Sequence, residues 1–424
     1  MTKYLAILRD SLREALDTKV LYFTVGLSLL TILLLGSLSF RPVPMEEQLS
    51  RATEMMTFLS DLGTQGRGPR YTVAEFEQTN PQAAAWQGDY RYVFVMSFGA
   101  AEDAQQVRKS NLITAEAIER DLAKSPWVKK VEAKELPATD PKEFRFQVRT
   151  WATENADRRD WVHEPALFFG LLPMSIFQTE LNDQIIFIAD YLIGTWGAGV
   201  TMLLSTIVTA FFIPNMLRKG TIDMLLAKPV YRSSLLVYKF IGGLTFMFLN
   251  TLIILAGVWL VLGLRTGVWI NSLLLCVFVF TFQFAIFYSI STLMAVTTRS
   301  PIAVILVTVA AWPLLSGIGW GYRYFDARRP DLNTTDLREQ RKAWHPAFYT
   351  TFDVLHFVTP RYKDFDVLTS RLIRKSLLTA DSRETKETDK EYASIRWDES
   401  LIITVLFIAI LLGLSCWWFA TRDY

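Results

Sequence analysis

The 424-residue chain has few of the side chains on which catalytic and metal sites depend. Its two cysteines, Cys276 and Cys416, both fall in apolar runs, so we predict neither a disulfide framework nor a thiolate metal site. Of the three histidines, His163 is followed by Glu164, but no second ligand stands at helical spacing. No GxxxxGKS/T motif and no GxSxG motif occur. We therefore expect no catalytic residue, no metal site and no cofactor bound by this chain.

Charged residues show no excess of either sign. The chain has 44 Lys and Arg residues against 42 Asp and Glu residues, which gives a net charge of +2. This balance gives no reason to expect a nucleic-acid partner, and we predict none. Apolar residues are abundant instead, at 51 % of the chain. We therefore predict an integral membrane protein surrounded by membrane lipids.

Six apolar runs are long enough to cross a bilayer, which takes about 20 helical residues. A cleaved signal peptide is the alternative for the first run. Acidic residues before that run (Asp10, Glu14 and Asp17) and the lack of a small-x-small cleavage site after it disfavour this alternative. The predicted transmembrane helices are residues 20–40, 186–213, 240–264, 268–296, 301–320 and 401–420.

The short segment 214–239 is basic, and short basic loops lie on the cytoplasmic side of a membrane. With six spans, both chain termini then face the cytoplasm, including the tail 421–424. Residues 1–19 read as an amphipathic helix in the cytoplasmic interface, with leucines at positions 5, 8, 12 and 16. A plain positively charged flank is the alternative for this N-terminal stretch.

Residues 41–185 are hydrophilic and predict a small extracytoplasmic α+β domain. Segment 166–177 contains Pro173 and is too short to span, so we expect it to lie on the outer leaflet. A loop is expected up to Gln87. The other expected elements are helices at 46–62 and 101–125 and strands at 90–98, 128–136 and 143–153.

These observations predict an all-α polytopic membrane protein with six transmembrane helices. The small α+β domain is inserted between helices 1 and 2. Residues 321–399 form a second extracytoplasmic region, a loop with interfacial helices, of which one is a basic helix near 361–378.

Asp190 is an acidic residue about one turn inside the second predicted span. Acids inside a membrane are usually functional, so Asp190 is a possible element of a translocation pathway. The alternative is a carboxylate that still lies at the level of the lipid headgroups.

The segment 214–239 has internal order. Gly220 and Thr221 can begin a helix, and Asp223 then lies in the first turn, near the positive end of the helix dipole. Pro229 ends that helix. We expect a short amphipathic helix with a basic rim, lying across the cytoplasmic face. On physical grounds alone, an ordinary loop whose basic residues only fix the topology is equally compatible.

The run Arg218-Lys219-Gly220-Thr221-Ile222-Asp223-Met224-Leu225-Leu226-Ala227-Lys228-Pro229-Val230-Tyr231-Arg232 resembles the signature of type-2 ABC transporter permeases. In that family the segment contacts a separate nucleotide-binding ATPase subunit, which binds the ATP, and an N-terminal elbow helix supports the contact. The resemblance implies a permease of the cell inner membrane, for export, as a homodimer or as a heterodimer with a similar permease. It implies ATPase-coupling roles for Arg218, Lys219, Gly220, Thr221, Asp223, Met224, Leu225, Lys228, Pro229 and Arg232.

Two other functions remain open at this stage. One is a non-transporting membrane scaffold or sensor whose extracytoplasmic domain recognises a partner, which would need no ATPase. The other is a membrane-embedded enzyme, which is disfavoured because no polar catalytic cluster is visible in the sequence. Catalysis by this chain alone is not expected. Transport would be driven by ATP hydrolysis on the partner subunit.

Overall fold

The structure is a computed structural model, and it describes residues 19–64, 68–110, 113–138, 140–191, 198–217, 231–326, 346–377 and 383–422. The chain divides into two compact units. Ser37–Ile185 form the first, which we call the α+β unit. The second, the helical unit, comprises the residues before Ser37 and those after Ile185.

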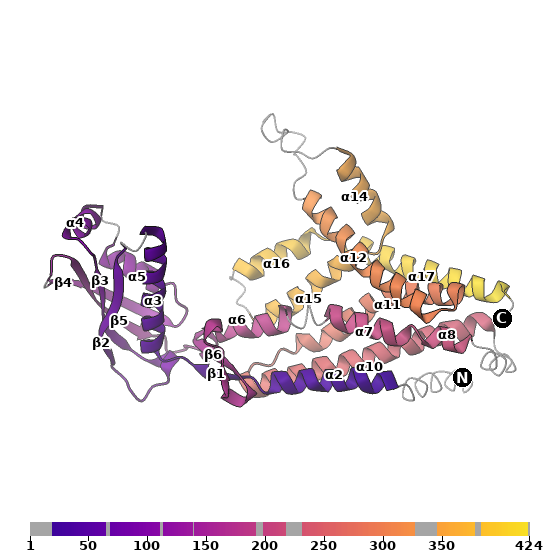
Figure 1. The fold of residues 1–424 in the computed structure, drawn as a ribbon, viewed down its shortest axis with the longest axis horizontal. Helices are drawn as coiled ribbons and strands as arrows, with labels where there is room; N and C mark the ends of the chain where they lie inside the picture. Colours follow the sequence, from indigo (N-terminus) through magenta and orange to yellow (C-terminus); the bar gives the residue numbers. More distant parts are fainter. Residues whose placement is uncertain are drawn as a thin grey trace. The chain divides into compact units, whose positions relative to one another are not determined.

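The α+β unit is built on a four-stranded antiparallel sheet. In spatial order its strands are β2 (Arg70–Gln78), β3 (Tyr90–Ser97), β5 (Glu143–Ala152) and β4 (Val128–Leu136). Strand β5 buries every second residue (Phe144, Phe146, Val148 and Thr150), as expected when one face of a sheet is covered. Helix α3 (Met45–Thr64) packs against β2, and α5 (Ala115–Leu122) packs against β4 (Figure 1).

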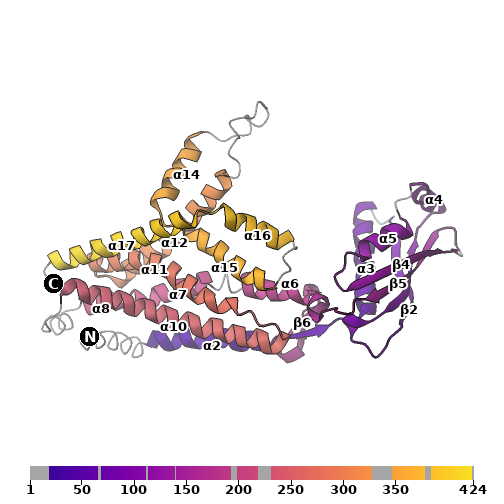
Figure 2. The same ribbon diagram turned by 180° about the vertical axis from the view of Figure 1, so that it is seen from behind.

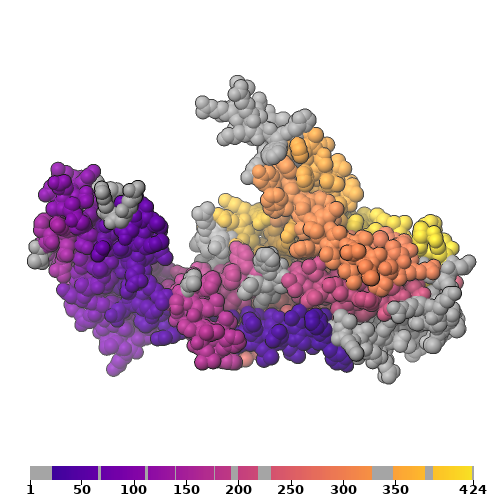
Figure 3. Space-filling model, in the orientation of Figure 1, coloured from indigo at the N-terminus to yellow at the C-terminus, as the bar shows by residue number. Residues whose placement is uncertain are grey.

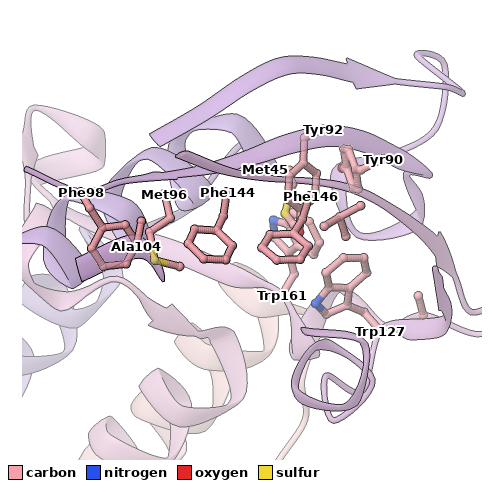
Figure 4. Close-up of a cluster of buried hydrophobic side chains, with 12 residues drawn as sticks. Met45, Tyr90, Tyr92, Met96, Phe98, Ala104, Trp127, Phe144, Phe146 and Trp161 are labelled. Carbon is pink, nitrogen blue, oxygen red and sulfur yellow. The ribbon is translucent and has the colours of Figure 1, made fainter. Parts of the chain in front are cut away.

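Aromatic side chains fill the core of this unit, as Figure 4 shows. Trp161 is almost completely buried and stacks with Tyr90, and its ring lies edge-on to that of Trp127. The indole Nε1–H of Trp161 donates to the carbonyl oxygen of Val43 at 2.9 Å, so the polar atom of this side chain is satisfied. The remaining buried members are Met45, Tyr92, Met96, Phe98, Ala104, Phe144, Phe146, Val148 and Ala156.

A second, smaller sheet contains the first and last strands of the unit. Strand β6 (Val162–Leu167) pairs antiparallel with β1 (Ser39–Pro42), β7 (Leu172–Pro173) and β8 (Thr179–Glu180). Short 3-10 turns, η3 (Phe168–Gly170) and η4 (Ser175–Phe177), flank β7, and α6 (Leu181–Ile186) follows β8. Two further 3-10 turns are η1 (Ala85–Gln87) and η2 (Arg158–Asp160).

His163 lies fully buried in β6 and is used structurally. Its Nδ1 lies 2.8 Å from the carbonyl oxygen of Trp161, and Nε2 accepts from Nε of Arg158 at 3.3 Å. This arrangement fits the neutral imidazole with the proton on Nδ1. Burial lowers the pKa of His163 below its ordinary value.

The α+β unit differs from the sequence-based expectation in two places. The segment expected to be a loop up to Gln87 contains strand β2. The single helix expected at 101–125 is two helices, α4 (Ala101–Ser110) and α5, because Thr114 caps a new helix with its side chain, which accepts from the backbone N–H of Ala117 at 3.2 Å. The three strands expected at 90–98, 128–136 and 143–153 are present within one residue at each end.

The helical unit is mostly a set of long apolar helices (Figures 1 and 2). Five described helical stretches are long and apolar enough to cross a membrane: Gly199–Met216, Arg232–Thr266, Ser272–Thr298, Pro301–Asp326 and Trp397–Thr421. Within the described residues a sixth apolar helix is shorter, at Tyr22–Gly36. The helices are α2 (Lys19–Gly36), α7 (Ala198–Thr209), α8 (Phe212–Met216), α10 (Arg232–Thr266), α11 (Ser272–Thr298), α12 (Pro301–Asp326), α14 (Pro346–Val358), α15 (Tyr362–Leu377), α16 (Arg383–Ser394) and α17 (Trp397–Thr421).

Several helix bounds differ from the predicted spans. Helix α2 ends at Gly36 rather than at residue 40, and α10 begins at Arg232 rather than at 240. Between 186 and 213 the chain forms a π-helical turn at 187–191, then α7 and α8, which are separated at Ala210 and Phe211. Because helix breaks and π turns depend on tertiary packing, hydropathy alone does not predict them.

Helix α11 is the centre of the helical unit. It packs against α7, α10, α12, α15 and α17, and from Gln283 to Ser289 it is buried on every side. Helix α2 lies beside α10, and Figure 3 shows it (indigo) at the surface of the unit, where Phe23 and Leu33 are exposed. The guanidinium of Arg265 in α10 donates to the last carbonyl oxygen of α2, at Gly36, from Nε at 2.9 Å and from Nη2 at 2.6 Å.

The contact between α10 and α11 depends on Gly243. A Cβ atom at this position would lie 2.4 Å from the ring of Tyr288. That ring is fully buried and stacked between Phe240 and Phe284, with centroid distances of 5.0 and 5.3 Å, so it has no room to move away. Gly243 therefore allows the two helices to approach closely.

We expect the Gly243→Ala variant to lose about 1–3 kcal/mol of stability, the usual cost of overpacking a core. Thermal unfolding of the purified protein in detergent would measure this loss. Gly413→Ala in α17 is the matched control, because a Cβ there meets no atom within 4 Å. An equal unfolding temperature for the two variants would contradict the role assigned to Gly243.

Glu180 in β8 gives the α+β unit a pH dependence. Burial, followed by the charges of Asp183 and Asp160, raises the pKa of Glu180 from 4.5 to about 7. Between these two values the folded unit keeps a proton that the unfolded chain has released. The stability contributed by Glu180 therefore falls as the pH rises from 4.5 to about 7.

Hydrogen exchange of the β6 and β8 amides, corrected for intrinsic rates, would measure this effect. We expect the stability of the native protein relative to Glu180→Gln to decrease across that pH range. The comparison with Glu180→Gln cancels the opposite contribution of His163, whose lowered pKa makes acidification unfavourable. A difference that does not change with pH would contradict the prediction.

Candidate functional site

Asp190 lies in the π-helical turn at 187–191, and its side chain is only 3 % exposed. Nε of Arg374 in α15 donates to its Oδ2 at 2.6 Å, and Oγ of Ser370 donates to its Oδ1 at 2.7 Å. Nη2 of Arg374 also donates to the hydroxyl of Tyr191 at 3.2 Å. Both carboxylate oxygens of Asp190 are thus satisfied by α15.

The Arg374 side chain is 17 % exposed, so this ion pair is largely removed from solvent. Transfer of an ion out of water costs several kcal/mol, and the interaction with a partner offsets that cost only with good geometry and further hydrogen bonds. Ser370 and Tyr191 supply such bonds. Separation of α15 from the 187–191 turn would break this ion pair and the hydrogen bonds of Ser370 and Tyr191.

A second buried carboxylate, Asp364, lies at the other end of α15. Nη2 of Arg323 in α12 donates to its Oδ1 at 3.2 Å, and Oγ of Ser400 in α17 donates to its Oδ2 at 2.5 Å. The same Nη2 of Arg323 also donates to the carbonyl oxygen of Lys363 at 2.9 Å. Asp364 therefore ties α15 to two of the apolar helices.

Two further polar contacts fix the start of α15. Gln283, fully buried within α11, donates from Nε2 to Oδ1 of Asp366 at 2.8 Å. Arg361, just before the helix, donates from Nη2 to Oε2 of Glu399 at 2.9 Å. Figure 2 shows α15 among α11, α12, α16 and α17. Helix α15 is therefore an integral part of the helical unit, held by polar contacts to the 187–191 turn, α11, α12 and α17.

Most of the predicted coupling segment lies outside the described residues. Arg218, Lys219, Gly220, Thr221, Asp223, Met224, Leu225, Lys228 and Pro229 all belong to it. Arg232 is described: it is the first residue of α10, and its Nη1 donates to the carbonyl oxygen of Arg422 at 3.0 Å. The elbow helix predicted at 1–19 also falls almost entirely outside the described residues.

The two ends of this segment enter one buried cluster, which we call the base cluster. Leu217 precedes residues 218–230, and Leu235 and Leu236 follow them in the first turns of α10; these three leucines are the segment flanks. The cluster joins α8, the first turn of α10, the last turn of α11, the start of α12 and the end of α17. Its buried members are Ala210, Ile213, Met216, Leu217, Leu235, Leu236, Ala295, Val296, Val304 and Phe419.

Comparison with known protein families shows to which family the chain belongs. Residues 174–424 match the family described as ABC-2 family transporter protein. The chain belongs to this family. The match includes every element of the helical unit except α2, and it leaves residues 1–173 outside. No curated protein matches the chain.

Membership of the ABC-2 family confirms the resemblance to type-2 ABC permeases drawn from segment 218–232. The chain is a multi-pass membrane protein and a permease of an ABC transporter, a class that associates with an ATP-binding partner. In this ABC-2 permease, Asp190 and the segment flanks lie in two separate places. Asp190 is paired with α15, whereas the flanks lie in the base cluster.

The sequence analysis missed the partners of Asp190 and the role of Gln283. The role of Gln283 could have been predicted from the sequence, because an amide within a long apolar run has to find a hydrogen-bonding partner in the membrane. No feature of the sequence predicts the pairing of Arg374 with Asp190, because Arg374 lies 184 residues away and looks like an ordinary basic residue of an amphipathic helix.

We expect the Arg374→Met variant to increase the hydrogen-exchange rates of the α15 backbone amides. Breaking a buried ion pair costs about 3 kcal/mol, so exchange of the α15 amides should accelerate on the order of 100-fold. Arg371→Met is the matched control on the same helix, because the Arg371–Asp389 pair is far more exposed, at 29 % and 44 %. It should change exchange by about tenfold or less. An equal increase in α15 hydrogen exchange in both variants would show that the buried Asp190–Arg374 pair stabilises α15 no more than the exposed pair does.

Proposed function

We propose that this chain is the permease subunit of an ABC exporter and that segment 214–239 couples it to separate nucleotide-binding ATPase subunits. Family membership supports the permease role. The base cluster is the observation that carries the coupling proposal, because Leu217 and Leu235, on either side of residues 218–230, are buried in it together with three other helix ends. Interiors of this kind are close-packed and transmit displacement.

In this proposal ATP binds only to the partner subunit. Closure of the ATPase subunits displaces the short helix that the sequence predicts from Gly220 and Thr221 to Pro229. Met224 and Leu225 fill an apolar groove of the ATPase. The polar residues that form charge pairs with it are Arg218, Lys219, Asp223, Lys228 and Arg232.

The displacement then passes to the membrane helices. Leu217 and Leu235 are rooted in the base cluster, so a movement of the segment acts on α8 and α10 and, through the cluster, on α11, α12 and α17. Arg232 is the polar link at this point, because it also holds the end of α17 through the carbonyl oxygen of Arg422.

We further propose a topology in the cell inner membrane. Helix α2 is the first of six spans, both termini are cytoplasmic, and the α+β unit is extracytoplasmic. Two copies, or this chain and a similar permease, form the pathway at their interface. Asp190 then lies along the pathway, at the point where the second span is held to α15.

A scaffold or sensor is the second candidate function, and one observation favours it. The last turns of α3 expose large apolar side chains, as expected of a surface that binds a partner. The exposed residues are Met55, Met56, Phe58, Leu59 and Leu62.

Affinity purification from the native membrane separates the two functions. We expect an ATPase subunit to copurify with the native chain and to be reduced more than about tenfold in Met224→Arg/Leu225→Glu, as when contacts worth about 2 kcal/mol are removed. Mass spectrometry and ATPase activity would measure its recovery.

Met56→Arg/Leu59→Glu makes the same chemical changes on α3 and should retain the ATPase. The scaffold function would be supported instead if no ATPase copurified with the native chain and other proteins were lost from the α3 variant.

A further inference from the structure

The chain from the turn after β6 to η4 carries an apolar tip, which we define as Phe168, Phe169, Leu171, Leu172 and Phe177. All five side chains are exposed, and Phe169 and Leu171 are exposed by 71 % and 81 %. From Ala166 to Thr179 no residue carries a charge. Side chains of this size and number are rarely left in water by a folded domain, so the tip is built to contact something apolar.

The backbone of the tip is strained in a way that presents these side chains. Phe168 and Phe169 have φ of 50° and 59°, in the left-handed region, and Gly170 follows at 101°. Bulky residues seldom adopt that region, and two in succession are retained only where the surrounding structure enforces them.

The contacts that hold this backbone come from Ser37, two residues before β1, and from Pro165 in β6. The N–H of Phe169 donates to the carbonyl oxygen of Ser37 at 2.7 Å, and the N–H of Phe168 donates to its hydroxyl at 3.3 Å. On the other side, the N–H of Met174 donates to the carbonyl oxygen of Pro165 at 2.8 Å. The tip is therefore a fixed structure and not a loose loop.

Ser37 identifies what the tip contacts. It directly follows Gly36, the last residue of the apolar helix α2, so it lies where the chain leaves that helix. The tip is hydrogen-bonded to this residue and is therefore held beside the point at which the chain leaves α2. An uncharged group of Phe and Leu side chains at that point fits the boundary between lipid headgroups and acyl chains.

We propose that the apolar tip inserts into the lipid leaflet at which α2 ends. The α+β unit is then attached to the bilayer by the tip as well as by its two chain connections. The inference rests on α2 crossing the membrane, which is part of the proposed function, and it is independent of any ATPase partner.

Fluorescence quenching in lipid nanodiscs tests this insertion with the full chain. Leu171→Cys is labelled in detergent with a small environment-sensitive fluorophore and then reconstituted. Leu62→Cys, on the exposed end of α3, is the matched control within the same unit. The chain without an introduced cysteine gives the background from Cys276 and Cys416.

Interfacial groups insert about 5–10 Å into the bilayer. We therefore expect quenchers attached to the upper part of the lipid chains to remove about half of the emission of the Leu171 label. Aqueous iodide should remove little of it. The Leu62 label should show the reverse. Quenching of the Leu171 label by iodide to the same extent as the Leu62 label would overturn the proposal. So would protection of the Leu171 label from both quenchers, which would mean that protein covers the tip. Neither result depends on ATPase binding, so this test and the copurification test fail separately.

Discussion

The need to pair buried charges is the constraint on which the helical unit depends. Asp190 and Asp364 are both almost completely buried, and each accepts hydrogen bonds from an arginine and a serine of other elements. Apolar side chains of similar volume would often stabilise such contacts as well or better. The ion pairs restrict the position of α15, because α15 cannot slide along its neighbours without breaking them. Its stable positions are therefore few and well separated.

Helix α11 connects this arrangement to the proposed coupling segment. Gln283, near its middle, holds Asp366 of α15, and Ala295 and Val296, near its end, belong to the base cluster. A continuous helix of 27 residues therefore contacts both places. Under the proposed mechanism, a displacement that begins at the segment flanks reaches α15 through the packed side chains of α11 and its hydrogen bonds to α15 from Gln283 and Ser272. The membrane contact proposed for the Phe168–Phe169 turn would keep the α+β unit at the bilayer while this happens.

Sequence reasoning predicted those parts of the fold that local pattern determines. Strand β3 was predicted from its aromatic and β-branched residues, β5 from its spaced apolar positions, and the long apolar helices from their uniform composition. It failed where a polar side chain continues or restarts a helix. Arg232 and Lys239 looked like a loop but form the first turns of α10, and Thr114 divides an apparently continuous helix. The family signature at 218–232 was recognised from residues alone, and the family match agrees with it. The pairing of Asp190 with Arg374 was not predictable, because only the tertiary fold brings the 187–191 turn against α15.

A double-mutant cycle between Asp190 and Arg374 tests the central claim most directly. The single variants Asp190→Asn and Arg374→Met and the double variant would be compared with the native protein through hydrogen exchange of the α15 amides. We expect a coupling free energy of at least about 1 kcal/mol, so that the double variant is less affected than the sum of the single variants. Additive effects, with a coupling free energy near zero, would show that the two charges do not hold α15 in place and would contradict the structural basis of the proposed mechanism.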